Sequence, residues 1–574
     1  METIRDLDLV VVGGGMGGIC AAIAAARLGC RVALVHDRPV LGGNASSECR
    51  VWICGADHHG RVENARETGL LEELRAENQR RNPQDSIWMW DAVLWDAVTR
   101  EPNIRLFLNA RCHDAGMERR GKIRAAIAMQ IGNEKRLRFE APLFLDASGD
   151  GEFAARAGAE YRRGREARSE FNEDMAPEQA DDLTLGSSLL FTVKDLGSPV
   201  KFDPPLWARK FKTDEDLPFR GHHTFKHPCN FWWIEWGGVK DTIADNEEIR
   251  DELLRILFGM WDHIKNHGDH DADNLALDWI GFVPAKRENR RFMGDHILTQ
   301  GDIENRVLFD DRVTYGGWPI DLHPPKGIYH AGRPAEMKQV DMYSIPLRCL
   351  YSRNIENLLF AGRLISGTHA AHGSYRVMGT GAVIGQAAGT AAAFCRRNGC
   401  TPREVAKQHI GEVQQQLLRD DCYILDLPNA DTDDLARKAK VAASSTESAP
   451  GVSPEAAING IARGTDAGPN QWRSDPAQPM PQWIELDLGE TKNISIVQLA
   501  FDTALGRLWG AEPHPETVRD YAIVADGAEV ANVSGNSDRF RRHSLTGVKA
   551  RRIRIRIDAT NGDPSARLFE ARIY

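Results

Sequence analysis

The sequence lacks long apolar runs and an excess of basic residues. Its longest apolar stretches, such as Ala21–Ala26, fall far short of the roughly 20 residues that span a bilayer, so we expect no membrane association. A formal net charge of −10 over 574 residues argues against nucleic acid or an anionic membrane as a partner. The opening segment METIRDLDLV has no basic stretch followed by an apolar one, and it is not typical of a secretory signal.

Cysteine is present but follows no ordered pattern. The ten cysteines include no C-x-x-C pair and no even spacing, which indicates scattered reduced thiols rather than a disulfide framework. We therefore expect a cytoplasmic protein. A hydrophobic content of 42% and a charged content of 27% are ordinary for a globular protein. The length predicts about three or four domains.

A glycine-rich loop follows the first apolar segment. Leu7–Val12 is predicted to be a strand, Gly13, Gly15 and Gly18 form G-x-G-x-x-G, and a small-residue helix leads to a second strand at Arg31–Val35. This strand, loop and helix context makes the motif credible. The glycines permit a tight turn, let a pyrophosphate approach backbone N–H groups, and allow close packing of helix on strand. The unit is therefore predicted to bind a dinucleotide.

The residue at the expected ribose-binding position is unusual. An acidic side chain is expected at the end of the second strand, but His36 stands there, followed by Asp37 and Arg38. An imidazole can bond one ribose oxygen, and Asp37 or Arg38 can share that role.

Three later segments extend the pattern. Arg38–Glu48 carries a second glycine pair, and Leu143–Ala159 is an apolar strand followed by Gly149-Asp150-Gly151. Asn357–Ala393 is a strand that ends at Gly362-Arg363, with a small-residue helix from about Gly379. Together with the first loop, these segments resemble the two-dinucleotide-binding-domain flavoproteins, which include the fumarate reductase flavoprotein subunits. GGNASSE, PAKRENRRFMGDHILTQGDI and GRLISGTHAAHGSYRVMGTGAVIGQAAG are closer still to the FAD-dependent oxidoreductase family found among bacterial glycan-degradation proteins.

The resemblance covers Asp6–Arg397 and implies an α/β fold. That fold is a Rossmann-like FAD domain of the GR2 type, built from residues 1–160 and 340–400, with an inserted β-rich substrate domain at 161–339. It implies bound FAD, with Asp150 toward the ribityl or pyrophosphate group and the helix after Met378 directed at the flavin. The implied cofactor-binding residues are Gly13, Gly15, Met16, Gly18, His36, Asp37, Arg38, Gly42, Gly43, Asn44, Ser46, Asp150, Gly362, Arg363, Gly379 and Gly381.

THAAHGSYR supplies the candidate catalytic groups. Hydride transfer to flavin N5 requires a partner that takes the hydroxyl proton, and a neutral histidine suits that task. His372 is the first candidate and His369 the second, whereas Arg376 would hold an oxyanion or a carboxylate. These residues could instead only line the flavin site. The family likeness also places Arg287 and Glu288 of AKRENRR near the substrate.

Cys49 and Cys54 have the C-x4-C spacing of flavin disulfide reductases, but they do not fit that class. In those enzymes the pair begins almost directly after the glycines, whereas Cys49 lies six residues past Gly43. A second G-x-G-x-x-G segment for NAD(P)H is also missing from the sequence. We therefore expect electrons to arrive by another route than bound NAD(P)H.

The predicted substrate domain contains an aromatic segment and a histidine pair. Alternation over Asn230–Gly238 predicts a strand whose tryptophans either form a sugar-stacking platform or pack inside a sheet. A helix is expected near Asn246–Asn266. His263 and His267 lie at i, i+4, but the GDHDADN that follows lacks the glycine and glutamate of an EF-hand loop. A polar helix end is the favoured interpretation, with no metal.

The last part of the chain changes in character. A helical connector is predicted at 401–435, and residues 436–574 are predicted to be all-β, with strands at Gln482–Gly489, Ile494–Asp502, Asp520–Asp526 and Arg551–Asp558. This part resembles the discoidin-like, galactose-binding-like jelly roll. Such modules bind sugars or only pack against their enzyme, and the latter is slightly favoured here.

These features favour a carbohydrate-directed FAD oxidoreductase. A small-molecule or oligosaccharide substrate would lose a hydride from a hydroxyl-bearing carbon, and the flavin would then pass electrons to an acceptor. In a redox-neutral variant, oxidation, elimination and hydride return would cleave a glycosidic bond, as in NAD-dependent glycosidases. The alternatives are a fumarate-reductase-like enoate reductase and a non-catalytic carbohydrate-binding flavoprotein. The oligomeric state is left open.

Overall fold

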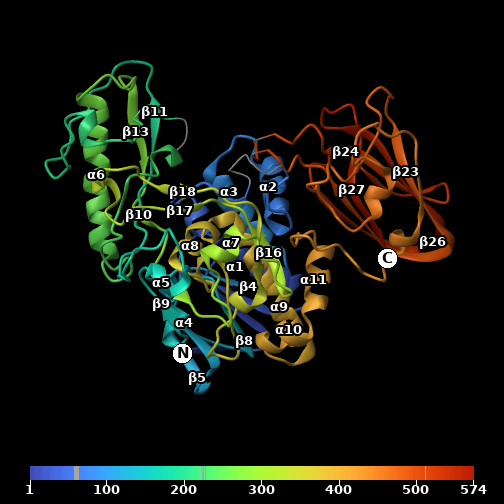
Figure 1. The fold of residues 1–574 in the computed structure, drawn as a ribbon, viewed down its shortest axis with the longest axis horizontal. Helices are drawn as coiled ribbons and strands as arrows, with labels where there is room; N and C mark the ends of the chain where they lie inside the picture. Colours follow the sequence, from blue (N-terminus) through green and yellow to red (C-terminus); the bar gives the residue numbers. More distant parts are fainter. Residues whose placement is uncertain (57–63, 223–224, 226–227, 508, 511) are drawn as a thin grey trace.

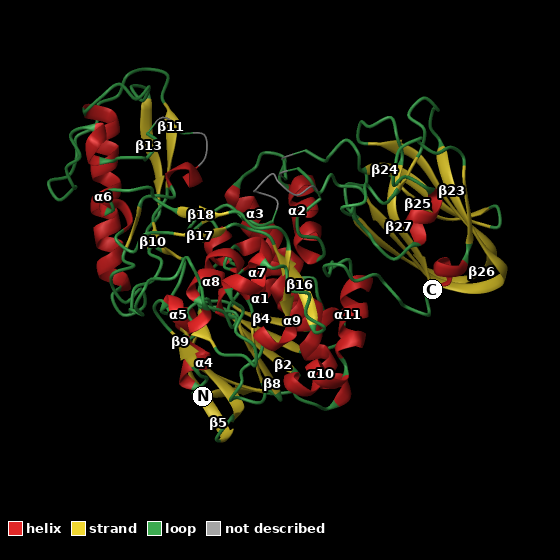
Figure 2. Ribbon diagram, viewed as in Figure 1, coloured by secondary structure: helices red, strands yellow, loops and turns green. Residues whose placement is uncertain are grey.

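The computed structural model describes all residues except 57–63, 223–224, 226–227, 508 and 511. A central α/β body lies between a small body built around one long helix and a C-terminal β body (Figure 1). Figure 2 shows helices gathered in the central body and strands dominating the C-terminal one. The described ends of the chain belong to different bodies.

A parallel five-stranded sheet organises the central body in the order β20-β8-β2-β3-β4. Four of its strands are buried along their whole length, as expected for a parallel sheet covered on both faces. This burial explains why they are continuous apolar runs in the sequence. The strands are β2 (Leu9–Val12), β3 (Val32–Val35), β4 (Ile104–Phe107), β8 (Leu143–Asp146) and β20 (Leu358–Phe360).

The strand order brings distant segments to one edge. Gly13 N donates to Val35 O at 2.8 Å, Ala147 N to Val12 O at 2.7 Å, and Ala361 N to Asp146 O at 3.1 Å. The chain therefore leaves β2, β8 and β20 side by side at their carboxyl ends, where open α/β sheets bind ligands. The predicted Rossmann-like fold is confirmed.

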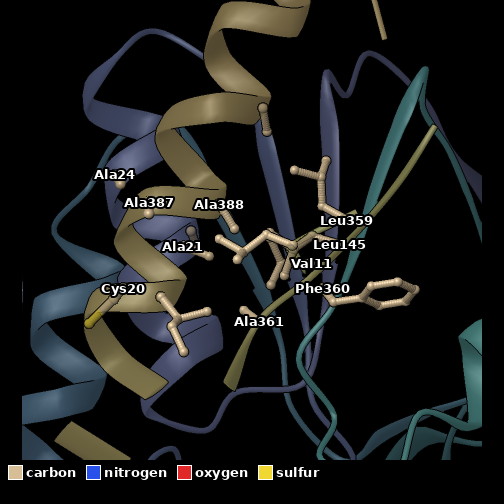
Figure 3. Packing of buried hydrophobic residues seen from close by; sticks show 14 of the residues in the cluster. Val11, Cys20, Ala21, Ala24, Leu145, Leu359, Phe360, Ala361, Ala387 and Ala388 are labelled. Atoms are coloured by element: carbon tan, nitrogen blue, oxygen red, sulfur yellow. The ribbon is translucent and has the colours of Figure 1, made fainter. Parts of the chain in front are cut away.

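Two small-residue helices, α1 (Met16–Arg27) and α9 (Met378–Asn398), pack together over this sheet. A Cβ on Gly385 would lie 2.0 Å from Gly17 O, and one on Gly389 would lie 2.2 Å from Ala21 O. Figure 3 shows Ala21 of α1 beside Ala387 and Ala388 of α9. The two backbones can approach this closely only because the facing residues are glycine and alanine.

The other elements of the central body cover the sheet or extend it. A second sheet has the order β1-β7-β6-β5. Among the described helices none is by itself long and apolar enough to cross a membrane, and α8 and α9 pass that test only as a pair bent by 92°. The elements are β1 (Glu2–Ile4), α2 (Leu70–Arg81), α3 (Ile87–Thr99), β5 (Ala110–Arg119), β6 (Lys122–Gln130), β7 (Lys135–Glu140), α4 (Glu152–Arg156), α8 (His369–Tyr375), α10 (Pro402–Gln408) and α11 (Ile410–Arg419).

The insert between β8 and β20 is built from short strands and the helix α6 (Asn246–Asn266), as predicted for that helix. Its own apolar core joins α6 to aromatic side chains. The remaining elements are β9 (Tyr161–Arg162), α5 (Arg168–Phe171), β10 (Ser187–Ser188), β11 (Phe191–Asp195), β12 (Glu235–Trp236), β13 (Leu275–Ile280), β14 (Ala285–Lys286), β15 (Arg291–Phe292), α7 (Gln300–Glu304), β16 (Arg312–Gly316), β17 (Ile320–Leu322), β18 (Glu336–Lys338) and β19 (Tyr343–Pro346).

The aromatic strand predicted at 230–238 is wrong for most of its length. Only Glu235–Trp236 forms a strand, and a short 3₁₀ turn ends at Phe231. Trp233 and Ile234 are adjacent and both are buried in the core with α6, so the alternation of a half-buried strand is lost. The tryptophan faces expected from that alternation are therefore not formed.

The C-terminal body is an antiparallel sheet in the order β22-β27-β23-β26-β24-β25, with β21 paired to β23. The predicted strands at 482–489 and 494–502 are parts of one long strand, β23, with a register shift after Asp487. The predicted all-β fold is confirmed. The strands are β21 (Lys440–Ala443), β22 (Trp472–Arg473), β23 (Gln482–Phe501), β24 (Val518–Ala525), β25 (Ala528–Val533), β26 (Phe540–Thr560) and β27 (Arg567–Ile573).

Buried arginines attach the C-terminal body to the central one. Arg66 is fully buried and donates to the backbone carbonyls of Thr503 and Arg507. From the other side, Arg539 pairs with Asp421 at 2.8 Å. Breaking buried, fully bonded charges is costly, so the two bodies are held in one arrangement.

Glycines in α9 and in α11 should respond in opposite ways to the same substitution. Gly389→Ala should lower stability by about 1–3 kcal/mol because the methyl group meets Ala21 O. Gly411→Ala in α11 meets nothing within 4 Å and should be neutral or stabilising by up to about 1 kcal/mol. Melting temperatures of the two variants check this, and equal values would contradict the packing.

Candidate active site

A cavity of about 390 Å³ opens at the carboxyl edge of the parallel sheet. It brings together residues that follow β2, β3, β8 and β20, and residues of the insert. The predicted site residues that line it are Gly13, Gly15, Met16, His36, Gly42, Gly43, Asn44, Arg287, Gly362, Arg363, Arg376 and Gly381. Within the described part of the chain, the predicted residues outside its lining are Gly18, Asp37, Arg38, Ser46, Asp150, Glu288, His369, His372 and Gly379.

The three glycines of the first loop have the different roles that the motif predicts. Gly13 has a φ of 104°, and a Cβ there would overlap Ala147. A Cβ on Gly18 would lie 1.8 Å from Gly13 O, so this glycine allows α1 to pack on the loop. A Cβ on Gly15 would meet nothing within 4 Å, and Gly15 lines the cavity. Its backbone is therefore open to a close ligand.

His36 joins the two glycine segments. Its Nδ1 accepts from Gly14 N at 3.0 Å, and its Nε2 lies 3.1 Å from Val40 O. Burial lowers the pKa of His36, so the ring is neutral at pH 7, with Nε2–H donating to Val40. Gly42 N also donates to Gly14 O at 2.8 Å. Both ring nitrogens thus contact the protein, and ribose binding by His36 stays a prediction.

The neighbours of His36, Asp37 and Arg38, do not line the cavity. Arg38 pairs with Glu48 at 3.2 Å, and the Asp37 carboxylate, 55% exposed, lies 3.4 Å from His36 Nδ1. Ser46 is buried and donates to Gly43 O at 2.7 Å, which stabilises the second glycine turn. Gly379 N donates to Cys54 O at 2.7 Å, which holds the first turn of α9 near the cavity.

Two cations in the cavity lining share one carboxylate. Lys286 and Arg363 line the cavity, and Asp150 pairs with them at 2.6 Å and 2.9 Å. Burial alone would raise the pKa of Asp150, but these two cations outweigh it and lower the pKa. Two cations facing one carboxylate leave one net positive charge beside the cavity.

Two helix N-termini face the same space. Gly15 is the N-cap of α1, and Val377 and Met378 begin α9. Neither helix has a side-chain cap or an acidic residue in its first turn. Their N–H groups and dipoles therefore favour an anionic ligand. Together with the open Cβ position of Gly15, these features fit a dinucleotide.

The lining of the cavity also includes a histidine between two carboxylates. His323 Nδ1 lies 2.6 Å from Glu235 Oε2, and its Nε2 lies 3.2 Å from Asp321 Oδ2. Arg376 donates to Asp321 at 2.9 Å, and Arg287 lies 3.4 Å from Glu235. All but Glu235 line the cavity, and Glu235 lies behind the ring. We call these five side chains the His323 cluster.

The His323 cluster is balanced in charge. Burial alone would raise the pKa of Glu235, but Arg287 and His323 outweigh it, and the pKa is lowered. Burial would also raise the pKa of Asp321, but His323 and Arg376 lower it well below its usual range. Two carboxylates and two guanidiniums therefore face one imidazole.

The sequence interpretation did not select His323, Asp321 or Glu235. Asp321-Leu322-His323 alternates at the end of β17, which places both polar side chains on one face. This alternation is the feature of the sequence from which Asp321 and His323 could have been selected. Trp232 and Trp318 line the same part of the cavity, with the Trp232 ring 5.1 Å from that of His323.

The two histidines predicted as bases lie behind this region. His372 is 1% exposed, its Nε2 lies 3.2 Å from Arg287 O, and burial lowers its pKa to about 3. Glu288 is buried between Arg291 and His369, with His369 Nδ1 at 2.9 Å. His369 lines a second cavity of about 670 Å³, which shares His323 and Met337 with the first. The catalytic roles of these residues stay predictions.

No disulfide joins Cys49 and Cys54. Cys49 is buried, which raises its pKa to about 12. Cys54 lines the cavity.

Comparison with known proteins agrees with this geometry. A family model described as FAD dependent oxidoreductase matches residues 8–417, and one described as F5/8 type C domain matches residues 440–570. A 42-residue segment is 56% identical to a dihydrolipoyl dehydrogenase of Manduca sexta, but it spans only 7% of this chain and 8% of that protein.

Solved carbohydrate-binding modules are also similar to part of the chain. One is the family 32 carbohydrate-binding module from Streptococcus pneumoniae EndoD, at 18% identity over 25% of this chain and 99% of that one, with a TM-score of 0.21. Another is chitosan-binding module 1 from a chitosanase/glucanase of Paenibacillus sp. IK-5, at 20% identity over 25% and 98%, with a TM-score of 0.20.

Gly15→Ala tests the dinucleotide site. The added methyl group meets no protein atom, so the melting temperature of the ligand-free protein should not change. The methyl group would occupy the space that a pyrophosphate needs, and the bound dinucleotide per chain should fall at least about tenfold. Gly132→Ala, which is equally open, is the control, and a normal dinucleotide content in Gly15→Ala would contradict the assignment.

The lowered pKa of His372 predicts that the protein loses stability as the pH falls. The ring takes up a proton near pH 6.5 when unfolded but only near pH 3 when folded. The buried neutral ring therefore contributes fully to the free energy of unfolding above pH 6.5. This contribution is lost as the pH falls toward 3, because the unfolded chain gains the proton first. At pH 4.5 the loss should be about 2–3 kcal/mol. Melting temperatures at pH 7 and pH 4.5 should differ less for His372→Gln than for the wild type or for the control His113→Gln.

Proposed function

The chain belongs to the FAD dependent oxidoreductase family, and from that premise we propose that it oxidises a carbohydrate hydroxyl group. The observation that supports this proposal is the single cavity that joins the dinucleotide loops to the His323 cluster. The residues of the glycine loops suit FAD, and those of the His323 cluster suit a neutral polar substrate. A C-terminal F5/8 type C domain, of a fold type that includes sugar-binding modules, is compatible with it.

The described residues divide between cofactor and substrate. Lys286, Arg363 and the N-termini of α1 and α9 would hold the pyrophosphate, and Gly15 and Gly43 would allow its close approach. When bound, FAD accepts a hydride from a substrate carbon. The protein must then provide a group that takes the hydroxyl proton and groups that orient the sugar.

His323 is the proposed base. In the neutral ring Glu235 accepts from Nδ1–H, and Nε2 carries the lone pair that a base needs. A ring protonated at both nitrogens would instead donate Nε2–H to Asp321 Oδ2 at 3.2 Å, so the proposal requires the neutral ring before substrate binds. As hydride leaves the carbon, the hydroxyl proton would move to Nε2. The positive charge that the ring gains lies between two carboxylates, which stabilise it as an orienting carboxylate does in other histidine bases.

The arginines and tryptophans would orient the substrate. Arg287 and Arg376 can donate to sugar oxygens from the cavity wall, while Trp232 and Trp318 offer aromatic surface to the C–H face of a sugar. This assigns to Arg287 and Arg376 a role close to the one expected from the sequence. His369, in the adjoining cavity, would contact a longer substrate.

The charge balance disfavours the enoate reductase alternative. A dicarboxylate needs cations whose charge is not already met, but Arg376 pairs with Asp321 and Arg287 lies near Glu235. A small dianion would therefore face two carboxylates as well as two guanidiniums. A neutral hydroxyl-bearing ligand has no such conflict.

Anaerobic mixing of the holoprotein with mono- and oligosaccharides tests the activity. Loss of the oxidised-flavin absorbance with one of these sugars is expected. Release of new reducing ends without net loss of that absorbance would instead support the redox-neutral cleavage. If no sugar changes either signal while small dicarboxylates reoxidise the dye-reduced flavin, the enoate reductase replaces the proposal.

His323→Gln identifies the base. Flavin reduction by substrate should slow by about 10²–10⁴-fold, with FAD content unchanged because the side chain contacts Glu235 and Asp321 and not the glycine loops. His372→Gln is the matched comparison, since that buried ring does not line the cavity. A normal rate in His323→Gln together with a large loss in His372→Gln would return the role to His372.

A further inference from the structure

Three histidines and one aspartate from separate segments of the insert meet at one point, and none of the four lines the cavity of the proposed active site. Asp214 begins a 3₁₀ turn, His222 follows it, His263 lies on α6, and His270 lies in the loop after α6. The three imidazoles are 0–4% exposed, whereas the side chain of Asp214 is 68% exposed. The donor atoms of all four lie within 4.8 Å of one another.

The distances within this group match metal ligands better than hydrogen bonds. Asp214 Oδ1 lies 3.0 Å from His263 Nε2, 3.6 Å from His222 Nδ1 and 3.7 Å from His270 Nε2. The two longer distances exceed those of hydrogen bonds. Ligands of a tetrahedral zinc with bonds near 2.0–2.1 Å are about 3.3 Å apart. One small cation at the centre would account for all three distances.

A second hydrogen bond orients one of the rings. His263 Nδ1 lies 3.2 Å from Phe211 O, to which Nδ1–H can donate. This leaves the lone pair of Nε2 directed at the group. A metal-bound histidine usually donates its other ring N–H to a carbonyl or carboxylate in this way.

From this geometry we propose that Asp214, His222, His263 and His270 bind a divalent transition metal, with Zn²⁺ as the favoured ion. Imidazole ligands select zinc and its neighbours over Mg²⁺ and Ca²⁺, and a set of four protein ligands is typical of a structural site. The exposed carboxylate supplies negative charge and an entry path. Binding places the lone pairs of three neutral rings and one carboxylate oxygen on the ion and releases any protons that those atoms held.

The four proposed ligands differ from the histidine pair His263 and His267 that the sequence pattern suggests. His267, the i, i+4 neighbour of His263, lies 3.8 Å from Asp262 and is not part of the group. His270 comes instead from GDHDADN, and His222 and Asp214 precede α6. Helical spacing within α6 could not reveal this arrangement, because three of the four ligands lie outside the helix.

The site would stabilise the part of the insert that has little regular pairing. The His222 ring lies 6.2 Å from that of Trp233, in the core that packs against α6. The same core segment continues into Trp232 and Glu235 at the proposed active site. A metal here would therefore link the segments that carry Asp214, His222 and His270 to α6 without contacting the substrate.

Metal analysis of the purified holoprotein tests the proposal without using activity. After dialysis against a chelator and then against Zn²⁺ and metal-free buffer, the wild type should retain about one zinc per chain. Re-addition of Zn²⁺ to the stripped protein should raise its melting temperature by at least about 5 °C. Zinc retention below about one tenth per chain, with no thermal shift, would overturn the proposal.

Variants locate the ion. Asp214→Asn changes an exposed side chain and should fold, but it should lose the zinc and the thermal shift. Glu215→Gln, the adjacent exposed acid, and His267→Ala should keep both. His270→Gln is expected to behave as Asp214→Asn does, and FAD content reports whether each variant is folded. Zinc retained equally by Asp214→Asn and His270→Gln would place the ion elsewhere and overturn the assignment.

Discussion

The absence of Cβ atoms at a few positions makes the central body possible. Gly13 and Gly18 let the first loop turn against Ala147 and against itself, and Gly385 and Gly389 let α9 lie on α1. Any side chain at these positions would overlap backbone atoms, which cannot move aside. This close approach places the start of α9 beside the start of α1, although more than 350 residues separate them. The cavity is formed where the two helices begin.

Charge pairing shapes the rest of that cavity. Lys286 and Arg363 share Asp150 and leave a net positive charge, which suits an anionic cofactor. The His323 cluster pairs each arginine with a carboxylate, which favours a neutral ligand over a charged one. Buried charges persist only when they are paired and hydrogen-bonded. The proposed division into cofactor and substrate residues therefore depends on which charges are balanced.

The insert and the C-terminal body are attached by different means. The insert contributes Glu235, Arg287 and Trp232, and it depends on its own small core around α6. The C-terminal body has a separate core between its strands, and it is joined to the central body through Arg66 and Arg539. The first attachment forms part of the active-site wall. The second fixes the orientation of a domain that does not line the cavity among the described residues.

The sequence by itself determined the parallel sheet, its glycine loop and the β character of the C-terminal body. These elements depend on local patterns, such as buried apolar runs, glycine spacing and the alternation of Ile553, Ile555 and Ile557, which a short window contains. The tertiary structure alone decided which polar residues meet. The sequence favours His372 and Glu288, but they do not line the cavity, whereas His323 and Asp321 line it and meet Glu235 from a distant segment. Burial, pairing and charge balance depend on those long-range contacts, and no local pattern records them.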